Sequence, residues 1–205
     1  MYQIHCGRAG EAGMGAARLD AMFRLRAEVF HQRLGWEVAV SQGREVDWFD
    51  AVGPRYVVLD GCGGSPGALG CARLLPAEGP NMLRDVFGFL LDGRPCPQGP
   101  DLLEVSRFAL SDAAGRGGYG FREAAAMLVA AVLDEAADAG AGALVGVTSA
   151  GFERLLRGLG LRVSRLGRVR RIGSVASLAF ELPLDAGNLA AVARHRAPRP
   201  LPVAA

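Results

Sequence analysis

Leu102-Leu-Glu-Val-Ser-Arg-Phe-Ala-Leu110 has the composition of a buried β-strand, and its flanking segments indicate the fold class. After it, residues 119–139 carry apolar side chains at helical spacing, and Ala143 to Thr148 is β-like again. Before it come three further strand candidates: Tyr2 to Cys6, Arg55 to Asp60 and Ala68 to Leu75. A strand meander followed by alternating helices and strands predicts an α/β fold with a mixed sheet flanked by helices.

Further elements fit the same layered fold. We predict helices over 16–34, 81–91 and 150–158, and strands over Leu161 to Leu166 and Val175 to Leu182. With 205 residues, 50% of them hydrophobic, the chain is long enough to bury one sizeable core. We therefore expect a single domain over residues 1–190 and a flexible, proline-containing tail over 191–205.

The composition also excludes several function classes. No uncharged apolar run reaches the roughly eighteen residues of a membrane span, and Met1 to Gly10 lacks the layout of a secretion signal. We therefore expect a cytoplasmic protein without membrane insertion. No CxxC spacing or suitably placed histidine accompanies the cysteines, which predicts reduced thiols and no metal site. These cysteines are Cys6, Cys62, Cys71 and Cys96.

The C-terminal part of the chain is basic. From Ala150 onward many arginines face only Glu153, Glu181 and Asp185, which suggests an acidic partner. The alternative is a solvated surface that serves solubility alone. Nucleic acid is disfavoured as the partner, because no aromatic residues are interleaved with the arginines.

Three arginines occupy positions where apolar residues are expected. Arg26 lies on the apolar stripe of the first helix, and Arg73 is in phase with apolar neighbours on its strand. In a regular strand, Arg107 is in phase with Leu103, Val105 and Ala109. Buried charges need partners, and the sequence offers four acids nearby: Glu45, Asp47, Asp50 and Glu104.

Two interpretations of these charges remain open. One is an internal salt-bridge network. The other is a pocket for a zwitterion, in which arginine holds a carboxylate and an acid holds an ammonium group. The aromatic residues Phe30, Trp36, Trp48 and Phe49 surround this acidic segment, where they either stack on a ligand or belong to the core.

The charged and aromatic residues fall into blocks whose order and spacing resemble the acyl-homoserine-lactone synthases, also called autoinducer synthases. The blocks are Arg26-Ala-Glu-Val-Phe30, Leu34-Gly-Trp36, Glu45-Val-Asp47-Trp-Phe-Asp50, Gly70-Cys-Ala-Arg73-Leu-Leu-Pro76, Gly79-Pro-Asn-Met-Leu83, Glu104-Val-Ser-Arg107-Phe108 and Val147-Thr-Ser-Ala-Gly-Phe-Glu153-Arg154. Each block is weak alone, but the ordered set is specific. The resemblance spans about residues 2–185.

The resemblance implies a fold similar to the GCN5-related N-acetyltransferases, in which a bulged central strand splays the sheet to admit a thioester arm. Glu104 and Arg107 fall on opposite faces of a regular strand, so a bulge between them could bring both into one cleft. This bulge is inferred from the family, since the spacing alone does not establish it.

The resemblance also implies the chemistry. S-adenosylmethionine, a substrate and not a cofactor, would be acylated on its amine by an acyl thioester and would then close to a lactone, releasing methylthioadenosine. The resemblance gives Glu104 the role of general base, with Arg107 beside it in the catalytic site. The predicted substrate-binding residues are Arg26, Phe30, Trp36, Asp47, Asp50, Arg73, Phe108, Gly146 and Thr148.

One position bears on the acyl group, and a set of arginines bears on its carrier. In the family, a threonine at the position aligned with Gly146 is associated with 3-oxo chains, so glycine there predicts more room and chains without that group. Acylated acyl carrier protein, which is strongly acidic, is the preferred donor, with coenzyme A as the other candidate. The predicted docking residues are Arg154, Arg157, Arg168, Arg170 and Arg171, with Arg165 nearby.

Two other functions remain. An N-acetyltransferase that uses acetyl-CoA would need a glycine-rich pyrophosphate loop, and Gly115-Arg-Gly-Gly-Tyr-Gly120 lies at that place. The loop lacks the Gln or Arg that usually occupies the first position of that motif, so we interpret it as a loop for the thioester arm. A non-catalytic acyl-binding module would leave Glu104 and Arg107 unexplained.

Overall fold

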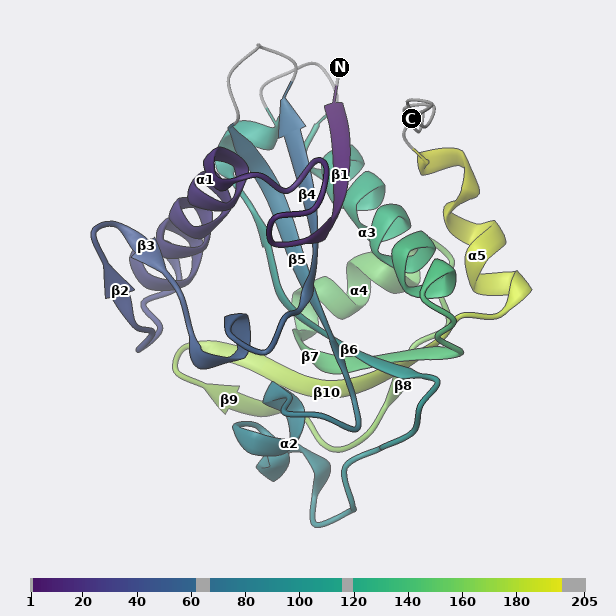
Figure 1. Ribbon diagram of the computed structural model, residues 1–205. Helices are drawn as coiled ribbons and strands as arrows, with labels where there is room; N and C mark the ends of the chain where they lie inside the picture. Colours follow the sequence, from purple (N-terminus) through teal and green to yellow (C-terminus); the bar gives the residue numbers. More distant parts are fainter. Residues whose placement is uncertain (1, 62–66, 116–119, 197–205) are drawn as a thin grey trace.

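A mixed eight-stranded sheet runs through the computed structural model, which describes residues 2–61, 67–115 and 120–196 (Figure 1). Among the described residues, only β6 and β7 pair in parallel, whereas the other neighbouring strands of this sheet pair antiparallel. In sheet order the strands are β1 (Tyr2–Arg8), β4 (Arg55–Gly61), β5 (Ala68–Pro76), β6 (Leu102–Leu110), β7 (Ala143–Ser149), β10 (Val175–Pro183) and β8 (Ser164–Arg165), and β9 (Arg170–Ile172) also pairs with β10. The predicted mixed sheet is confirmed.

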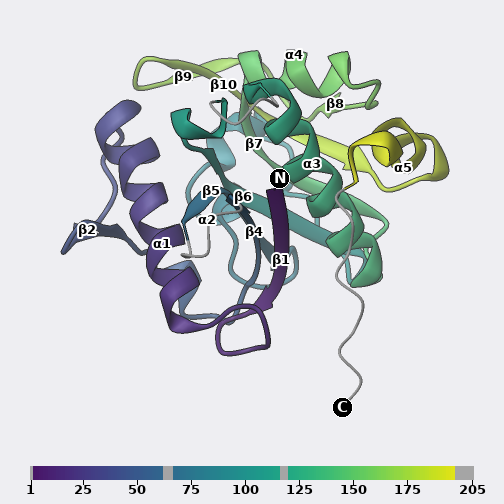
Figure 2. The same cartoon turned by 90° about the horizontal axis from the view of Figure 1, so that it is seen from above.

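Helices cover both faces of this sheet (Figure 2). One face carries α1 (Ala16–Arg26), its π-helical continuation η1 (Ala27–Arg33) and α2 (Met82–Asp85). The other carries α3 (Phe121–Asp138), α4 (Ala150–Gly158) and α5 (Ala186–Val192). Because side chains alternate between the two faces along a strand, β4 contributes to both cores. Val57 belongs to the core under α3, and Val58 belongs to the core under α1.

Several predicted elements differ from the structure. The helix expected over 81–91 divides into α2 and the 3₁₀ turn η3 (Gly88–Leu91), and the strand expected over 161–166 shrinks to the two residues of β8. The hairpin of β2 (Val40–Ser41) and β3 (Arg44–Glu45), strand β9 and helix α5 were not predicted. Short elements lack a sequence period long enough to detect.

The predicted C-terminal tail begins too early. Residues 191–195 belong to α5 and to the 3₁₀ turn η5 (Ala193–His195), which contacts α3. The remainder of the tail, 197–205, lies outside the described residues, as do 116–119 of the glycine-rich loop and Cys62. The flexibility of the tail therefore stays a prediction.

A bulge and a strand separation shape the centre of the sheet. Along β5 and β6, Cys71 pairs with Ala109 and Arg73 pairs with Ser106, so β6 carries one extra residue. Arg107 in this bulge has a φ of 52°, a left-handed conformation that costs about 1–3 kcal/mol for a residue other than glycine. Pairing of β6 with β7 stops at Val105 and Gly146, and beyond that point the sheet opens.

Candidate active site

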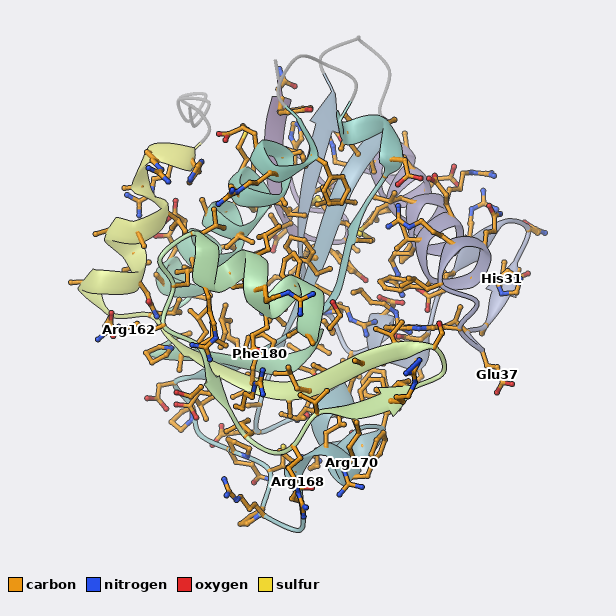
Figure 3. The ribbon with its side chains drawn as sticks, turned by 180° about the vertical axis from the view of Figure 1, so that it is seen from behind. His31, Glu37, Arg162, Arg168, Arg170 and Phe180 are labelled. Carbon is orange, nitrogen blue, oxygen red and sulfur yellow. The ribbon has the colours of Figure 1, made fainter. Side chains whose placement is uncertain are left out.

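A cavity of about 270 Å³ is lined by residues of the diverging ends of β6 and β7. Its walls come from both faces of the sheet, with Phe30 from η1 on one side and Phe152 from α4 on the other. Phe180, on β10 next to α4, also lines it (Figure 3). The remaining lining residues are Val29, Arg33, Leu34, Trp36, Met82, Phe87, Glu104, Val105, Ser106, Arg107, Phe108, Ala109, Leu110, Phe121, Val147, Thr148, Ser149, Val175 and Ser177.

The bulge turns Arg107 toward the α1 face. The phase predicted for a regular strand is therefore wrong for this residue: Val105 packs into the core under α3, whereas the Arg107 side chain reaches Glu45 on the α1 side. The bulge inferred from the family is confirmed. It brings Glu104 and Arg107 together around Met82, whose backbone N–H donates to Glu104 and whose sulfur accepts from Arg107 Nη1 at 3.0 Å.

Arg26 is completely buried and bonded to two carboxylates. Its Nε donates to Glu45 at 2.5 Å, and its two terminal nitrogens donate to Asp50 at 2.8 and 2.9 Å. This bidentate geometry is the one that a guanidinium matches best. Tyr56 also donates to Asp50, at 3.0 Å. The buried carboxylates are thus held by several donors.

Arg73 and Arg107 complete this network. Arg73, also completely buried, donates to both oxygens of Asp47 at 2.5 and 3.0 Å and to Ser106 Oγ at 3.1 Å. The Nη2 group of Arg107 lies 2.8 Å from Glu45 Oε1 and 2.8 Å from Asp47 Oδ2. The network therefore matches three guanidinium groups with three carboxylates.

The network keeps its charges despite burial. Burial alone would raise the pKa values of Glu45 and Asp50, but hydrogen bonds and charge from the arginines outweigh it and hold both pKa values below the ordinary range. Burial likewise disfavours the charged form of Arg26, and contacts with Asp50 and Glu45 reverse the effect and raise its pKa. All three groups therefore stay ionised at neutral pH.

Only one member of the network lines the cavity. Arg107 does so, whereas Arg26, Arg73, Asp47 and Asp50 lie behind it and pair with one another. The internal-network interpretation thus describes this structure, and the direct contacts predicted between those four residues and a substrate stay predictions. Their geometry shows how they position Arg107.

Glu104 differs from the other acids, because backbone groups and not arginines satisfy it. Its two oxygens accept from the N–H groups of Met82 at 3.0 Å and Leu83 at 2.6 Å, where α2 begins. Burial raises the pKa of Glu104, and these two N–H groups offset only part of the effect. Glu104 thus lines the cavity with an elevated pKa, as a proton-accepting group at neutral pH requires.

The predicted aromatic cluster divides into two parts. Phe30 and Trp36 stack with ring centroids 5.3 Å apart, and both line the cavity. The guanidinium of Arg107 lies 5.3 Å from the Phe30 centroid. Trp48, by contrast, is 61% exposed, and Phe49 is buried beneath Arg73. Of the four aromatic residues, Phe30 and Trp36 are therefore the two that face the site.

The side of the cavity next to α4 is rich in aromatic side chains. Phe108 and Phe152 have ring centroids 4.5 Å apart, and Thr148 lies on the same wall. Ser149 accepts from the Phe152 N–H and caps α4, which fixes Phe152 at the cavity. Phe152 lies in the sequence block from Val147 to Arg154, but the sequence does not predict it as a site residue. Nothing in the local sequence distinguishes a residue of the cavity wall from a residue of the core.

Gly146 does not enlarge the cavity, contrary to the sequence-based expectation. It is absent from the lining, and a Cβ added there would stand 2.4 Å from the carbonyl oxygen of Val105. Glycine is required because β6 and β7 approach closely at this pair. The predicted preference for acyl chains without a 3-oxo group was based on extra room at Gly146, and this reason no longer holds. The side chain of Thr148 does line the cavity.

The arginines of the predicted docking region are exposed, and four of them form two pairs. Arg157 and Arg165 both donate to Glu153, whereas Arg168 and Arg170 both pair with Asp92. Two further exposed arginines are Arg154, on α4, and Arg171, whose Nη2 donates to the Ser174 carbonyl. The sequence did not reveal either acidic partner.

Within the described residues, Cys71 and Cys96 are free thiols. The same part of the chain contains no helix long and apolar enough to cross a membrane.

Comparisons with known proteins define the class and then the family. A structure from Lactobacillus plantarum, named as a candidate N-acetyltransferase, matches with a TM-score of 0.59 at 15% identity over 89% of this chain and 98% of that one, which shows the fold alone. The autoinducer synthase family model matches residues 12–192. The chain belongs to the autoinducer synthase family, and its activity is that of an acyl-homoserine-lactone synthase, an acyltransferase.

Individual relatives agree with this assignment. An acyl-homoserine-lactone synthase from Ralstonia solanacearum is 37% identical over 196 residues, covering 92% of this chain and 91% of the relative. The crystal structure of the synthase LasI matches with a TM-score of 0.86 at 31% identity, covering 98% of this chain and 99% of LasI. BjaI, a CoA-dependent synthase solved with S-adenosylmethionine and isopentyl-CoA, matches with a TM-score of 0.83 at 25% identity, covering 95% and 90%.

Proposed function

We propose that this chain acylates the amine of S-adenosylmethionine with an acyl thioester and closes the product to a lactone. The observation that carries the proposal is the cavity through the opened sheet, charged at Glu104 and Arg107 and aromatic at Phe108 and Phe152. Such a cavity suits a polar nucleophile at one end and an acyl chain at the other. The structure of BjaI with S-adenosylmethionine and isopentyl-CoA supports this pair of substrates.

The reaction proceeds in two balanced steps. The amine nitrogen attacks the thioester carbonyl, the new C–N bond forms, the C–S bond breaks, and the leaving thiolate takes up the amine proton that Glu104 has accepted. A carboxylate oxygen then attacks the carbon next to the sulfonium, that C–S bond breaks, and methylthioadenosine departs. Glu104 accepts the amine proton in the first step, directly or through one water, because its pKa is raised and it faces the cavity.

The residues around the cavity divide this work. Arg107 provides a guanidinium for the substrate carboxylate, and the network behind it prevents the side chain from turning away. The stacked pair of Phe30 and Trp36 provides a flat wall for the nucleoside end. Phe108 and Phe152 enclose the acyl chain.

We propose acyl carrier protein as the preferred acyl donor. The support is the exposed arginine surface from Arg154 to Arg171, since an acidic protein gains from a basic docking surface and coenzyme A needs only one or two cations. BjaI is named as CoA-dependent, so both donors belong in the test.

The test incubates pure protein with S-adenosylmethionine and either octanoyl carrier protein or octanoyl-CoA. Methylthioadenosine is measured by chromatography and the lactone by mass spectrometry. We expect both products, in equal amounts. Arg107→Gln should abolish both, whereas the matched control Arg84→Gln, at a half-buried arginine paired with its neighbour Asp85, should not. Acyl transfer without methylthioadenosine would instead indicate an N-acetyltransferase, and binding without turnover would indicate an acyl-binding module.

A further inference from the structure

Exposed apolar side chains gather beside two of the exposed arginines. Val86 is 47% exposed, Phe89 51% and Val169 39%, although large apolar side chains are usually buried. Val86 and Phe89 follow α2, and Val169 stands between Arg168 and Arg170. Several exposed apolar residues on neighbouring segments indicate a surface that a partner covers.

The two segments that carry these residues are joined. A Cβ at Gly167 would stand 2.0 Å from the Leu90 carbonyl oxygen, so the backbones touch there. Asp92 joins them again, because it accepts from the Arg168 backbone N–H at 2.7 Å and from Arg170 Nη2 at 2.6 Å. Phe89 and the two arginines therefore belong to one continuous surface, which we call the Phe89 surface.

The Phe89 surface retains free positive charge. The Nε group of Arg168 lies 3.4 Å from Asp92, and 85% of the side chain is exposed. Arg170 makes the closer contact with Asp92, which lowers the pKa of that acid to about 2. One ionised carboxylate thus faces two guanidinium groups, and Arg168 is the one available to a partner.

The other arginine group lacks an apolar centre. Arg157 and Arg165 both bond to the largely buried Glu153, and no large apolar side chain on α4 is exposed among the described residues. Interfaces derive most of their affinity from a few apolar and arginine side chains at their centre. The Phe89 surface has this composition, whereas the exposed large apolar side chain closest in the fold to the α4 arginines, Phe121, belongs to α3 and lines the cavity.

The Phe89 surface is also adjacent to the cavity. The Phe87 ring lines the cavity and contacts the Phe89 ring edge-on, with centroids 6.4 Å apart. A partner seated on Phe89 thus lies one aromatic ring away from the wall of the cavity.

We propose that the Phe89 surface is where the acyl carrier protein docks, through a helix whose acidic residues surround an exposed apolar residue. The apolar residue would pack on Phe89, Val86 and Val169, and the acids would face Arg168 and Arg170. This inference rests on the proposed function, because it assumes a carrier protein as the donor.

The experiment measures binding and turnover separately. Titration calorimetry gives the Kd of octanoyl carrier protein without S-adenosylmethionine, and kinetics give KM for that donor and for octanoyl-CoA. We expect Phe89→Ala and Arg168→Ala each to raise Kd and KM for the carrier protein about tenfold, as central interface residues do. KM for octanoyl-CoA and the melting temperature should stay unchanged.

The matched control is Arg162→Ala. Arg162 is an exposed arginine in the same basic segment, paired with Asp185, and Figure 3 shows it well apart from Arg168 and Arg170. It should leave every constant at the wild-type value.

Each contrary result has its own meaning. If Arg154→Ala weakens the carrier protein and Phe89→Ala does not, docking occurs on α4 and the inference is wrong while the proposed function stands. If Phe89→Ala converts a wild-type dimer to a monomer, the surface joins two copies of this chain, which also overturns it. If wild type binds no carrier protein and uses only octanoyl-CoA, the donor assignment fails, and if no donor gives methylthioadenosine, the proposed function fails.

Discussion

The molecule uses the same pairing of arginine with carboxylate in two very different places. In the buried network, Arg26 and Arg73 are inaccessible to solvent and each bonds to two carboxylates. On the surface, Arg168 is 85% exposed and shares one acid with Arg170. Removing one partner from a buried pair typically costs about 3–5 kcal/mol, whereas exposed pairs contribute about 0–1 kcal/mol.

This contrast separates two roles for charge. The buried network cannot rearrange without stranding a charge, so it fixes Arg107 at the cavity. The surface pairs can exchange an internal carboxylate for one from a partner at little cost. Glu104 is a third case, buried but bonded to backbone N–H groups, and its pKa moves in the opposite direction from those of Glu45 and Asp50.

The largest expected effect is that of Arg26→Ala. It leaves Glu45 and Asp50 with lost hydrogen bonds, and we expect the free energy of unfolding to fall by about 3–5 kcal/mol, with loss of activity. Urea unfolding measures this change. Arg24→Ala, on the same helix but exposed and paired with Asp20, is the control and should change stability by about 0–1 kcal/mol. Equal effects of the two substitutions would remove the distinction between buried and exposed pairs.

Glu104→Gln should lower turnover by about 10²-fold or more, because it removes the proton acceptor. The substitution is nearly isosteric, but the structure shows that it is not neutral for the fold. Both oxygens of Glu104 accept hydrogen bonds from backbone N–H groups. The glutamine amide has only one oxygen, so one of these N–H groups loses its acceptor, at a cost of about 1–3 kcal/mol. Single-turnover rates on folded protein separate the two effects. A near-normal rate would exclude Glu104 as the base.

Stability should fall in acid because of the buried network. The folded-state pKa values of Glu45 and Asp50 are lowered, so their stabilisation is fully present above the unfolded values of about 4 and is lost as pH falls toward the lower folded values. Glu104 has the opposite sign, since its raised folded pKa makes protonation favour the folded state. We expect urea unfolding from pH 7 to pH 2 to show a net loss below about pH 4. A flat profile would contradict this assignment.

The smallest effect belongs to Asp92→Asn on the surface. It frees Arg168 and Arg170 from their internal acid, so the KM for octanoyl carrier protein should fall about two- to fivefold at low salt and return toward wild type above about 0.1 M salt. The melting temperature should barely change. An increase in KM would mean that Asp92 holds the arginines in the docking geometry.

Much of the fold was predictable from periodicity. The bounds of β6 and α4 agree with the sequence-based prediction, and α3 differs by only a few residues at its ends, because these elements are long and regular in apolar spacing. The ordered blocks around Arg26, Glu104 and Arg107 also identified the family, since charged residues at apolar positions are too costly to arise without a reason.

What the sequence by itself determined is therefore which charges would be buried and which family they mark. Only the tertiary structure decided which carboxylate meets which arginine, since Arg26 and Asp50 are joined by packing and not by spacing. It also decided that Gly146 serves close strand pairing, because its neighbour Val105 lies on another strand. The bulge at Arg107 has the same origin: a residue is turned to one face of a sheet by its pairing with the next strand, and no single strand carries that information.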